Sequence, residues 1–218
     1  MEQSIAKNSK IDVVLFDFGG VLSAEGWKKG LTVIAKANGL SADRLIQTAA
    51  DTIYETGYIT GKCSESDFWN ALKIKTGIRG DNTSLRHELM SRFVLDDRMM
   101  DLARKLRAAN LTVGILSDQT DWLDQLNVRF DFFKYFDHVF NSYHLGKGKR
   151  DSSLFDDVAG FLKTSPNRIL FIDDDPGNVK RARQKGWQAI LYGDAGSFYS
   201  EMDKVYISVC KTGQMLVK

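Results

Sequence analysis

The stretch Val-Val-Leu-Phe-Asp-Phe-Gly-Gly-Val-Leu at residues 13–22 decides the fold. Its apolar run, Val13–Phe16, is typical of a strand that is buried on both faces. Asp17 follows the run directly, and the next two glycines, Gly19 and Gly20, let the backbone turn tightly and approach a ligand closely. The stretch predicts a carboxylate at the carboxyl edge of a sheet. Taken alone, a turn in which Asp17 caps backbone amides explains it slightly better.

Apolar runs of the same kind recur along the chain, with helical patterns between them. The remaining strands are expected at residues 112–116, 138–140, 168–172 and 188–191. Helices are expected at residues 99–108, 151–162 and 178–185, the last ending at Gly186. Alternation of strands and helices is typical of a doubly wound parallel sheet. The fold class is therefore α/β, with a Rossmann-like core.

One region interrupts this alternation, because residues 25–93 contain no convincing strand. Glycines divide the region into about four helical stretches, and Ser64 and Asp67 have the spacing of a capping box. We expect an α-helical cap domain at residues 24–94, inserted into a core domain of residues 1–23 and 95–218. Such an insert would lie over the carboxyl ends of the strands, where open α/β sheets bind ligands.

Composition excludes several classes of partner. The 218 residues include 30 Lys and Arg against 28 Asp and Glu, so the net charge of +2 predicts neither a nucleic acid nor a membrane surface as partner. The apolar runs are far shorter than the roughly 20 residues of a membrane span. Cys63 and Cys210 lack metal-ligand spacing, and the polar N-terminus lacks the apolar core of a signal peptide. We expect a cytoplasmic protein, monomeric or homodimeric.

Two further polar positions adjoin predicted element ends. Ser117 follows a buried strand, and its hydroxyl, with the backbone amides of Asp118 and Gln119, could hold phosphate oxygens. A plain N-cap serine is the commoner case. Lys149 precedes a helix and offers a mobile positive charge that suits phosphate. Because Arg150 and other basic residues flank it, a solvated basic loop explains this motif better when it stands alone.

The most acidic position is the sequence Asp173-Asp174-Asp175, with Asn178 close behind it. Adjacent like charges cost stability unless a cation neutralises them, and carboxylates are the hard oxygen ligands that Mg²⁺ prefers. With Asp17, Ser117 and Lys149, these residues supply a nucleophile, a hydroxyl, an ammonium and a metal carboxylate at one edge of the sheet. Phosphoryl transfer needs that set of groups.

In the order of these four motifs, the chain resembles the haloacid dehalogenase-like (HAD) hydrolase superfamily from about residue 11 to residue 192. The resemblance implies that Asp17 is the nucleophile and a Mg²⁺ ligand, with the backbone carbonyl of Gly19 and the carboxylate of Asp174 as further ligands. The remaining implied roles are phosphate binding by Ser117, Asp118, Lys149 and Gly20, catalytic roles for Ser117 and Lys149, and support from Asp173 and Asn178.

Two departures from the family pattern concern Gly19 and Arg150. Phosphatases of this superfamily usually carry a second aspartate where Gly19 stands, and general acid–base help of that kind contributes roughly 10²–10⁴ in rate. A similar branch with glycine at this position includes sugar-phosphate phosphatases. Three residues could replace the missing acid, and the sequence does not choose among them: Asp173, Asp175 and Glu25. Arg150 stands where the family often has proline.

Two functions follow from the resemblance. The first is a Mg²⁺-dependent phosphatase that acts on a small phosphorylated metabolite, such as a sugar phosphate, through an aspartyl-phosphate. The alternative is a catalytically weak or silent member that binds a phosphorylated ligand or a protein. Dehalogenases of the superfamily need no metal, so the Asp173–Asp174 pair favours the phosphate branch. Four cap aromatics could line the entrance, although packing between helices explains most of them better: Trp27, Tyr54, Tyr58 and Trp69.

Overall fold

The computed structural model describes residues 10–193, 198–199 and 202. Cys210 and the N-terminal segment 1–9, on which two of the expectations rest, lie outside the described residues. Cys63 is a half-buried free thiol. Within the described residues, no helix combines the length and the apolar character that crossing a bilayer requires.

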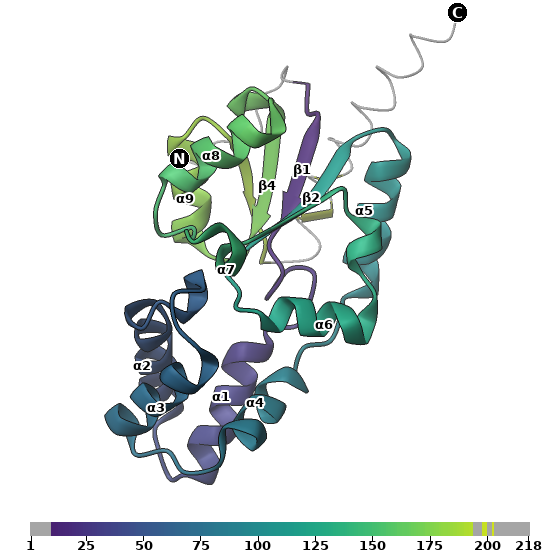
Figure 1. Cartoon of the computed structure of the whole chain (residues 1–218). Coiled ribbons are helices and arrows are strands. Elements are labelled where there is room, and N and C mark those ends of the chain that lie inside the picture. The colour runs from purple at the N-terminus through teal and green to yellow at the C-terminus, as the bar shows by residue number, and fades with distance from the viewer. Residues whose placement is uncertain (1–9, 194–197, 200–201, 203–218) are drawn as a thin grey trace, which may run out of the picture.

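The centre of the molecule is a parallel sheet of five strands in the order β3-β2-β1-β4-β5 (Figure 1). The strands are β1 (Val13–Phe16), β2 (Thr112–Ser117), β3 (His138–Asn141), β4 (Ile169–Asp173) and β5 (Gln188–Leu191). The doubly wound α/β fold is therefore confirmed. Each strand end lies within one residue of its expected position, because short apolar runs bounded by polar residues mark buried strands clearly.

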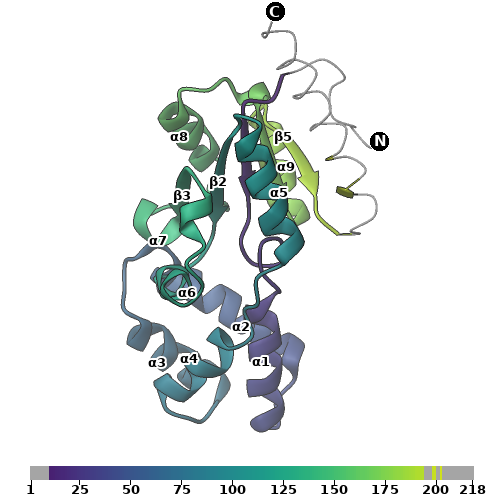
Figure 2. The same cartoon turned by 90° about the vertical axis from the view of Figure 1, so that its right-hand side faces the viewer.

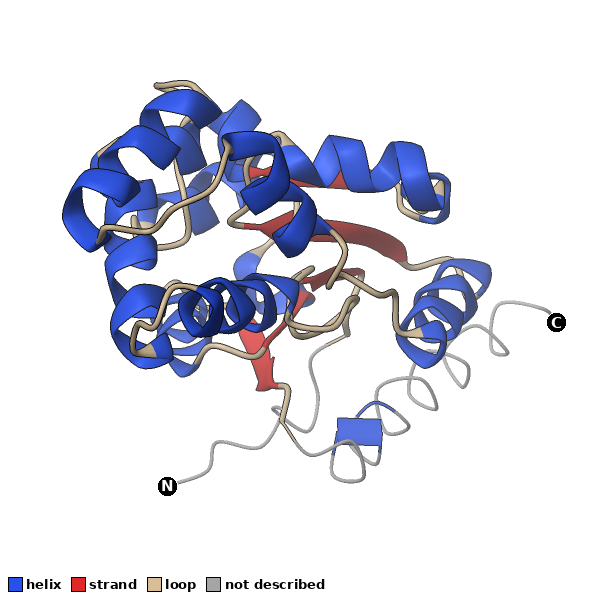
Figure 3. Cartoon of the chain, turned by 90° about the horizontal axis from the view of Figure 1, so that it is seen from below, coloured by secondary structure: helices blue, strands red, loops and turns tan. Residues whose placement is uncertain are grey.

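Helices cover both faces of the sheet (Figures 2 and 3). Alternate side chains of β1 point to opposite faces. Val14 and Phe16 pack with α5 (Asp97–Ala108) and α6 (Trp122–Phe130). Val13 and Leu15 pack on the other face with α8 (Ser153–Leu162) and α9 (Pro176–Gln184). Helix α9 begins two residues earlier than the sequence pattern predicts, since Asp175 caps it and Pro176 fits its first position.

Four α-helices, with a short 3-10 helix at Tyr58–Thr60 among them, lie between β1 and α5 and form a separate bundle below the sheet in Figure 1. They are α1 (Gly26–Ala37), α2 (Ala42–Glu55), α3 (Glu65–Thr76) and α4 (Asn82–Met90). The capping box at the start of α3 is present in full, as expected. Where the chain leaves and re-enters the sheet, the two segments are hydrogen-bonded to each other, with 2.8 Å between Ala24 N and Val94 O. The division into domains at this point stays a prediction.

The helical insert has its own apolar core, and one of its members comes from outside the insert. Trp122, the first residue of α6, is 1% exposed and belongs to the cluster formed by α1–α4. Its ring centroid lies 6.1 Å from that of Trp27 and 6.2 Å from that of Trp69. Tyr58 and Trp69 are buried in this cluster. Both therefore pack between helices and do not line an entrance.

The order of the strands places a topological switch point at β1. From β1 the chain continues to β2 and β3 on one side, and later to β4 and β5 on the other. Ligands of doubly wound sheets bind at such a switch point, outside the carboxyl ends of the strands. Those ends point toward the helical insert in Figure 1. The residues that follow β1, β2 and β4 therefore share one edge.

Candidate active site

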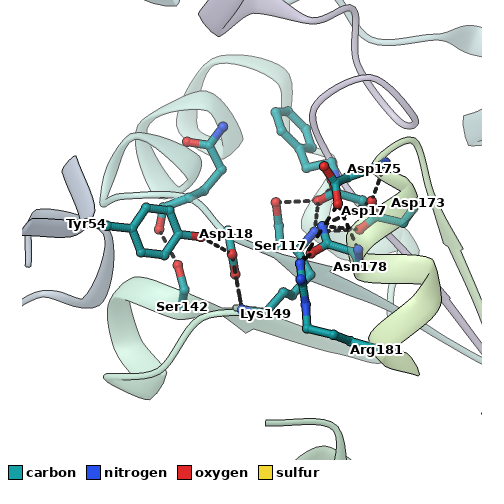
Figure 4. A network of polar contacts seen from close by, with 12 residues as sticks. Asp17, Tyr54, Ser117, Asp118, Ser142, Lys149, Asp173, Asp175, Asn178 and Arg181 are labelled. Atoms are coloured by element: carbon teal, nitrogen blue, oxygen red, sulfur yellow. Dashed lines mark hydrogen bonds and ion pairs between the residues drawn. The ribbon is translucent and has the colours of Figure 1, made fainter. Parts of the chain in front are cut away.

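Asp17 lies at the switch point, and its carboxylate is held by three donors (Figure 4). Its Oδ1 accepts hydrogen bonds from the backbone N of Phe18 at 2.7 Å and from Ser117 Oγ at 2.8 Å. Lys149 Nζ lies 3.0 Å from the same oxygen. The structure therefore brings together the three residues for which the sequence predicts catalytic roles. Asp17 is buried, and its side chain keeps 12% of its surface exposed.

Lys149 is a fixed, buried cation. Its side chain is 2% exposed, and Nζ lies between Asp17 Oδ1 and Asp173 Oδ2, the latter at 2.7 Å. Burial alone would lower the pKa of Lys149, but the charges of Asp17 and Asp173 outweigh it and raise the pKa above its ordinary value. Interpreting the motif as a solvated basic loop is therefore wrong for Lys149.

Asp173 has no exposed surface, and both oxygens of its carboxylate accept hydrogen bonds within the protein. It accepts hydrogen bonds from the backbone N of Asp175 at 2.7 Å and from the side-chain amide of Asn178 at 3.0 and 3.1 Å. These bonds come from the N-terminal end of α9, which fixes the position of Asp173 against Lys149. This arrangement places Asp173 and Asn178 as supports of the Lys149 ammonium.

Asp174 completes an acidic cluster with Asp17 and Asp173, in which one oxygen atom of each residue lies within 4.8 Å of the others. The backbone of Gly20 passes so close that a Cβ there would lie 2.5 Å from Asp174 Oδ2, and its φ of 81° also favours glycine. A larger residue at position 20 would therefore push the turn that follows Asp17 away from Asp174.

Electrostatics make this cluster a good host for a divalent cation. Burial raises the pKa of Asp17 to about 8, against the attraction of Lys149. Burial, Glu25 and Asp173 raise the pKa of Asp174 to about 6. Three carboxylates against one ammonium leave two negative charges when all are ionised. Carboxylate and carbonyl oxygens at this edge are the ligands that Mg²⁺ prefers, so the residues fit this ion.

The carboxylate of Asp118 is engaged within the protein. Its Oδ1 accepts a hydrogen bond from the backbone N of Lys149 at 2.8 Å, and its Oδ2 accepts one from the Tyr54 hydroxyl. Phosphate binding by the backbone of Asp118 stays a prediction. Neither contact is predictable from the sequence, because Asp118 lies 64 residues from Tyr54 and 31 residues from Lys149, and no local pattern pairs such distant residues.

Asp175 and Glu25, two of the candidates to replace an acid at position 19, differ in exposure and in their distance from that position. Asp175 is exposed and caps α9 through the backbone N of Asn178 at 2.7 Å. Glu25 is half-buried at the start of α1. A Cβ on Gly19 would meet Glu25 Oε2 at 4.0 Å, and no other heavy atom of the described residues beyond its chain neighbours lies that close. Glu25 also lies 3.6 Å from Lys28 Nζ.

Known proteins resemble parts of this chain. Bifunctional epoxide hydrolase 2 of Rattus norvegicus is 30% identical over 114 residues, covering 49% of this chain and 20% of that protein. Flavin mononucleotide hydrolase 1 of Arabidopsis thaliana is 26% identical over 129 residues, covering 59% of this chain and 53% of that protein. The chain thus spans between a fifth and about half of the length of these relatives.

A similar fold occurs in a HAD family enzyme from Bacteroides thetaiotaomicron, crystallised in complex with magnesium and inorganic phosphate. The TM-score is 0.67 at 22% identity, over 85% of this chain and 96% of that chain. At this identity the likeness shows the fold alone.

The model of the haloacid dehalogenase-like hydrolases matches residues 11–186, a segment that includes β1, β2, β4 and the four motifs. The resemblance expected from the sequence is confirmed at this level. The assignment of the insert to a cap type and of Gly19 to a branch stays a prediction. Because the match covers well over half of the chain, the protein belongs to the haloacid dehalogenase-like hydrolases.

Proposed function

We propose that this protein is a Mg²⁺-dependent phosphatase of a small phosphorylated metabolite, for which a sugar phosphate is one candidate. One observation carries the proposal. Asp17 is buried at the switch point, held by Ser117 and Lys149 within 3.0 Å, and adjoins a cluster of carboxylates. The names of the Arabidopsis relative, a hydrolase of a phosphorylated flavin, and of the magnesium and phosphate complex from Bacteroides support it.

Three groups at the sheet edge would hold the metal: the carboxylates of Asp17 and Asp174 and the backbone carbonyl of Gly19. When bound, Mg²⁺ would neutralise charge on the phosphoryl oxygens. The choice of Asp174 over Asp173 follows from their partners, because Asp173 is saturated by Lys149, Asn178 and a backbone amide. Among the described residues, no hydrogen bond or ion pair engages the Asp174 carboxylate.

The proposed reaction proceeds in two displacements at phosphorus. A carboxylate oxygen of Asp17 attacks, the bond from phosphorus to the leaving oxygen breaks, and an aspartyl-phosphate forms. Water then attacks the same phosphorus, the bond to Asp17 breaks, and inorganic phosphate leaves. Ser117 Oγ would donate to a phosphoryl oxygen, and Lys149 Nζ would stabilise the charge that develops on the transferred group.

A substrate panel tests the proposed function. Purified protein is offered p-nitrophenyl phosphate and a set of sugar phosphates, with Mg²⁺ or with EDTA, and released phosphate is measured. We expect hydrolysis that depends on Mg²⁺. Because p-nitrophenolate is a good leaving group, this ester needs little acid catalysis. If it is not hydrolysed while inorganic phosphate still binds, the silent phosphate-binding alternative replaces the enzyme.

We propose Glu25 as the residue that supplies acid–base help in place of an aspartate at position 19. Apart from chain neighbours, its Oε2 is the heavy atom nearest to a Cβ at position 19 among the described residues, whereas no atom of Asp175 lies within 4 Å of that Cβ and both oxygens of Asp173 are hydrogen-bonded. Glu25→Gln keeps an acceptor for the start of α1. We expect it to lower kcat on alkyl phosphates by about 10²-fold and on p-nitrophenyl phosphate by much less, since only the alkoxide needs a proton.

The complementary variant is Gly19→Asp, because position 19 has room for a Cβ and no positive φ. In the Glu25→Gln background, it should restore hydrolysis of alkyl phosphates more than that of p-nitrophenyl phosphate. If Glu25→Gln lowered kcat equally on both substrates, Glu25 would have no part in the proton transfer.

Binding of Mg²⁺ should depend on pH in a defined direction. The pKa values of Asp17, about 8, and Asp174, about 6, lie above the ordinary 3.8, so the metal-free folded state holds protons that the unfolded chain releases. These two groups therefore favour folding less as the pH rises from 4 to 8. Mg²⁺ binds the ionised carboxylates, so its increase in Tm should grow between pH 5 and pH 8 in thermal-shift assays. A flat or opposite trend contradicts the assignment.

A further inference from the structure

The carboxylate of Asp118 joins the helical insert to the loop that carries Lys149 (Figure 4). From the core side, the backbone N of Lys149 donates to Asp118 Oδ1 at 2.8 Å and also lies 3.1 Å from Oδ2. The loop is pressed against this carboxylate, since a Cβ on Gly148 would lie 3.1 Å from Oδ1. From the insert side, the Tyr54 hydroxyl donates to Oδ2.

Tyr54 is held in a second way by the residue that follows Lys149. The guanidinium carbon of Arg150 lies 3.7 Å from the centroid of the Tyr54 ring, which is the geometry of a cation–π contact. Burial and the Asp118 charge raise the pKa of Tyr54, so its hydroxyl keeps its proton and remains a donor. One side chain of α2 thus contacts the Lys149 loop directly at Arg150 and indirectly through Asp118.

We propose that Tyr54 is a positioning residue for Lys149 and acts through Asp118. The packing of the insert against the core then determines where the ammonium of Lys149 lies. The kinetic part of this proposal rests on the proposed phosphatase function. The physical reason is that the ammonium of Lys149 is held at short distances from its partners. Lys149 Nζ lies within 3.0 Å of Asp17 and Asp173, so a shift of its backbone moves the charge relative to the reacting phosphorus. A displacement of about 1 Å can reduce turnover by roughly 10²-fold.

The chain contains a matched control for this contact. The Tyr58 hydroxyl also crosses from the insert to the core and donates to a carboxylate, that of Asp121. Asp121 precedes α6, and its Oδ2 accepts a hydrogen bond from the side chain of Gln125 in the first turns of that helix at 3.1 Å. None of the hydrogen bonds of Asp121 within the described residues leads to the Lys149 loop. Removing either hydroxyl therefore deletes one bond between insert and core, but only one of the two bonds reaches Lys149.

The test compares Tyr54→Phe with Tyr58→Phe in the full chain. Both variants should lose similar thermal stability. Tyr54→Phe is expected to lower kcat on p-nitrophenyl phosphate about tenfold with little change in KM, and to weaken inhibition by inorganic phosphate, while Tyr58→Phe leaves both near wild type. Equal kinetic losses in the two variants would show that general loosening of the interface is responsible, and would overturn the proposal.

Amide hydrogen exchange gives a readout that does not depend on activity. In Tyr54→Phe, the peptide that contains residues 147–150 should exchange several times faster than in the wild type, because the acceptor of the Lys149 amide is no longer held from the insert side. Tyr58→Phe should leave this peptide unchanged. Unchanged exchange in Tyr54→Phe overturns the positioning role even if the protein is a phosphatase. Faster exchange in a protein without phosphatase activity would instead refute the proposed function alone.

Discussion

Asp17→Asn is expected to abolish measurable turnover of p-nitrophenyl phosphate, with a loss of about 10³-fold or more in kcat. An amide is a poor nucleophile, and the aspartyl-phosphate cannot form without the carboxylate. The substitution keeps the shape of the side chain and an acceptor for Phe18 N and Ser117 Oγ, so the site should stay folded. Steady-state phosphate release measures the effect.

A suitable control for this variant is Asp12→Asn, at the other end of β1. Asp12 forms an ion pair with Arg168 on the surface, far from the carboxyl edge of the sheet, and its replacement should leave kcat unchanged. Asp17→Asn should also retain or raise the Tm of the metal-free protein, because it removes one of three crowded carboxylates. Retention of more than a tenth of wild-type turnover would contradict nucleophilic catalysis by Asp17.

Lys149→Met should have the largest effect on stability. It leaves Asp17 and Asp173 buried without their shared cation, and breaking a buried ion pair in this way costs about 3–5 kcal/mol. The folded-state pKa of Lys149 is raised by the carboxylates around it, so the lysine stays charged at pH 7 and its pairing with Asp173 contributes to stability there. Urea unfolding at pH 7, without metal, measures the loss.

Lys147→Met is the matched control on the same loop. Lys147 pairs with Asp157 at the surface, where ion pairs contribute little, so the urea midpoint should hardly move. Mg²⁺ should recover part of the stability of Lys149→Met, because a divalent cation would offset the uncompensated carboxylates. A loss no larger than that of the control would mean that Lys149 is dispensable for holding Asp17 and Asp173 together.

The sheet and most of the polar groups at its edge could be predicted because the information is local. Each strand is a short apolar run, and Asp17, Ser117 and the acidic triplet follow such runs directly. In a parallel sheet, residues that follow neighbouring strands meet at one edge. Sequence position alone therefore placed Asp17 beside Asp174, although the two follow different strands.

What the sequence did not reveal depends on contacts between distant segments. Lys149 looks like part of a basic loop in sequence, yet it is buried because Asp17 and Asp173 surround it. In the sequence, Tyr54 has the pattern of an ordinary residue on the apolar face of a helix. Its hydrogen bond to Asp118 joins residues that lie 64 positions apart. No periodicity encodes such pairs, and only the packing of the insert on the core brings them together.

Trp122 has a consequence for how this fold could be divided or exchanged. Its ring completes the apolar core of the insert, although the residue belongs to α6, on the other side of β2 in the chain. A peptide of residues 24–94 would carry a hole of tryptophan size, and an unrelated insert grafted here would meet a large indole that it has no space to accept. In this chain the core of the insert therefore depends on the residue that follows Asp121, and the boundary between insert and core domain in sequence differs from the boundary between their apolar cores in space.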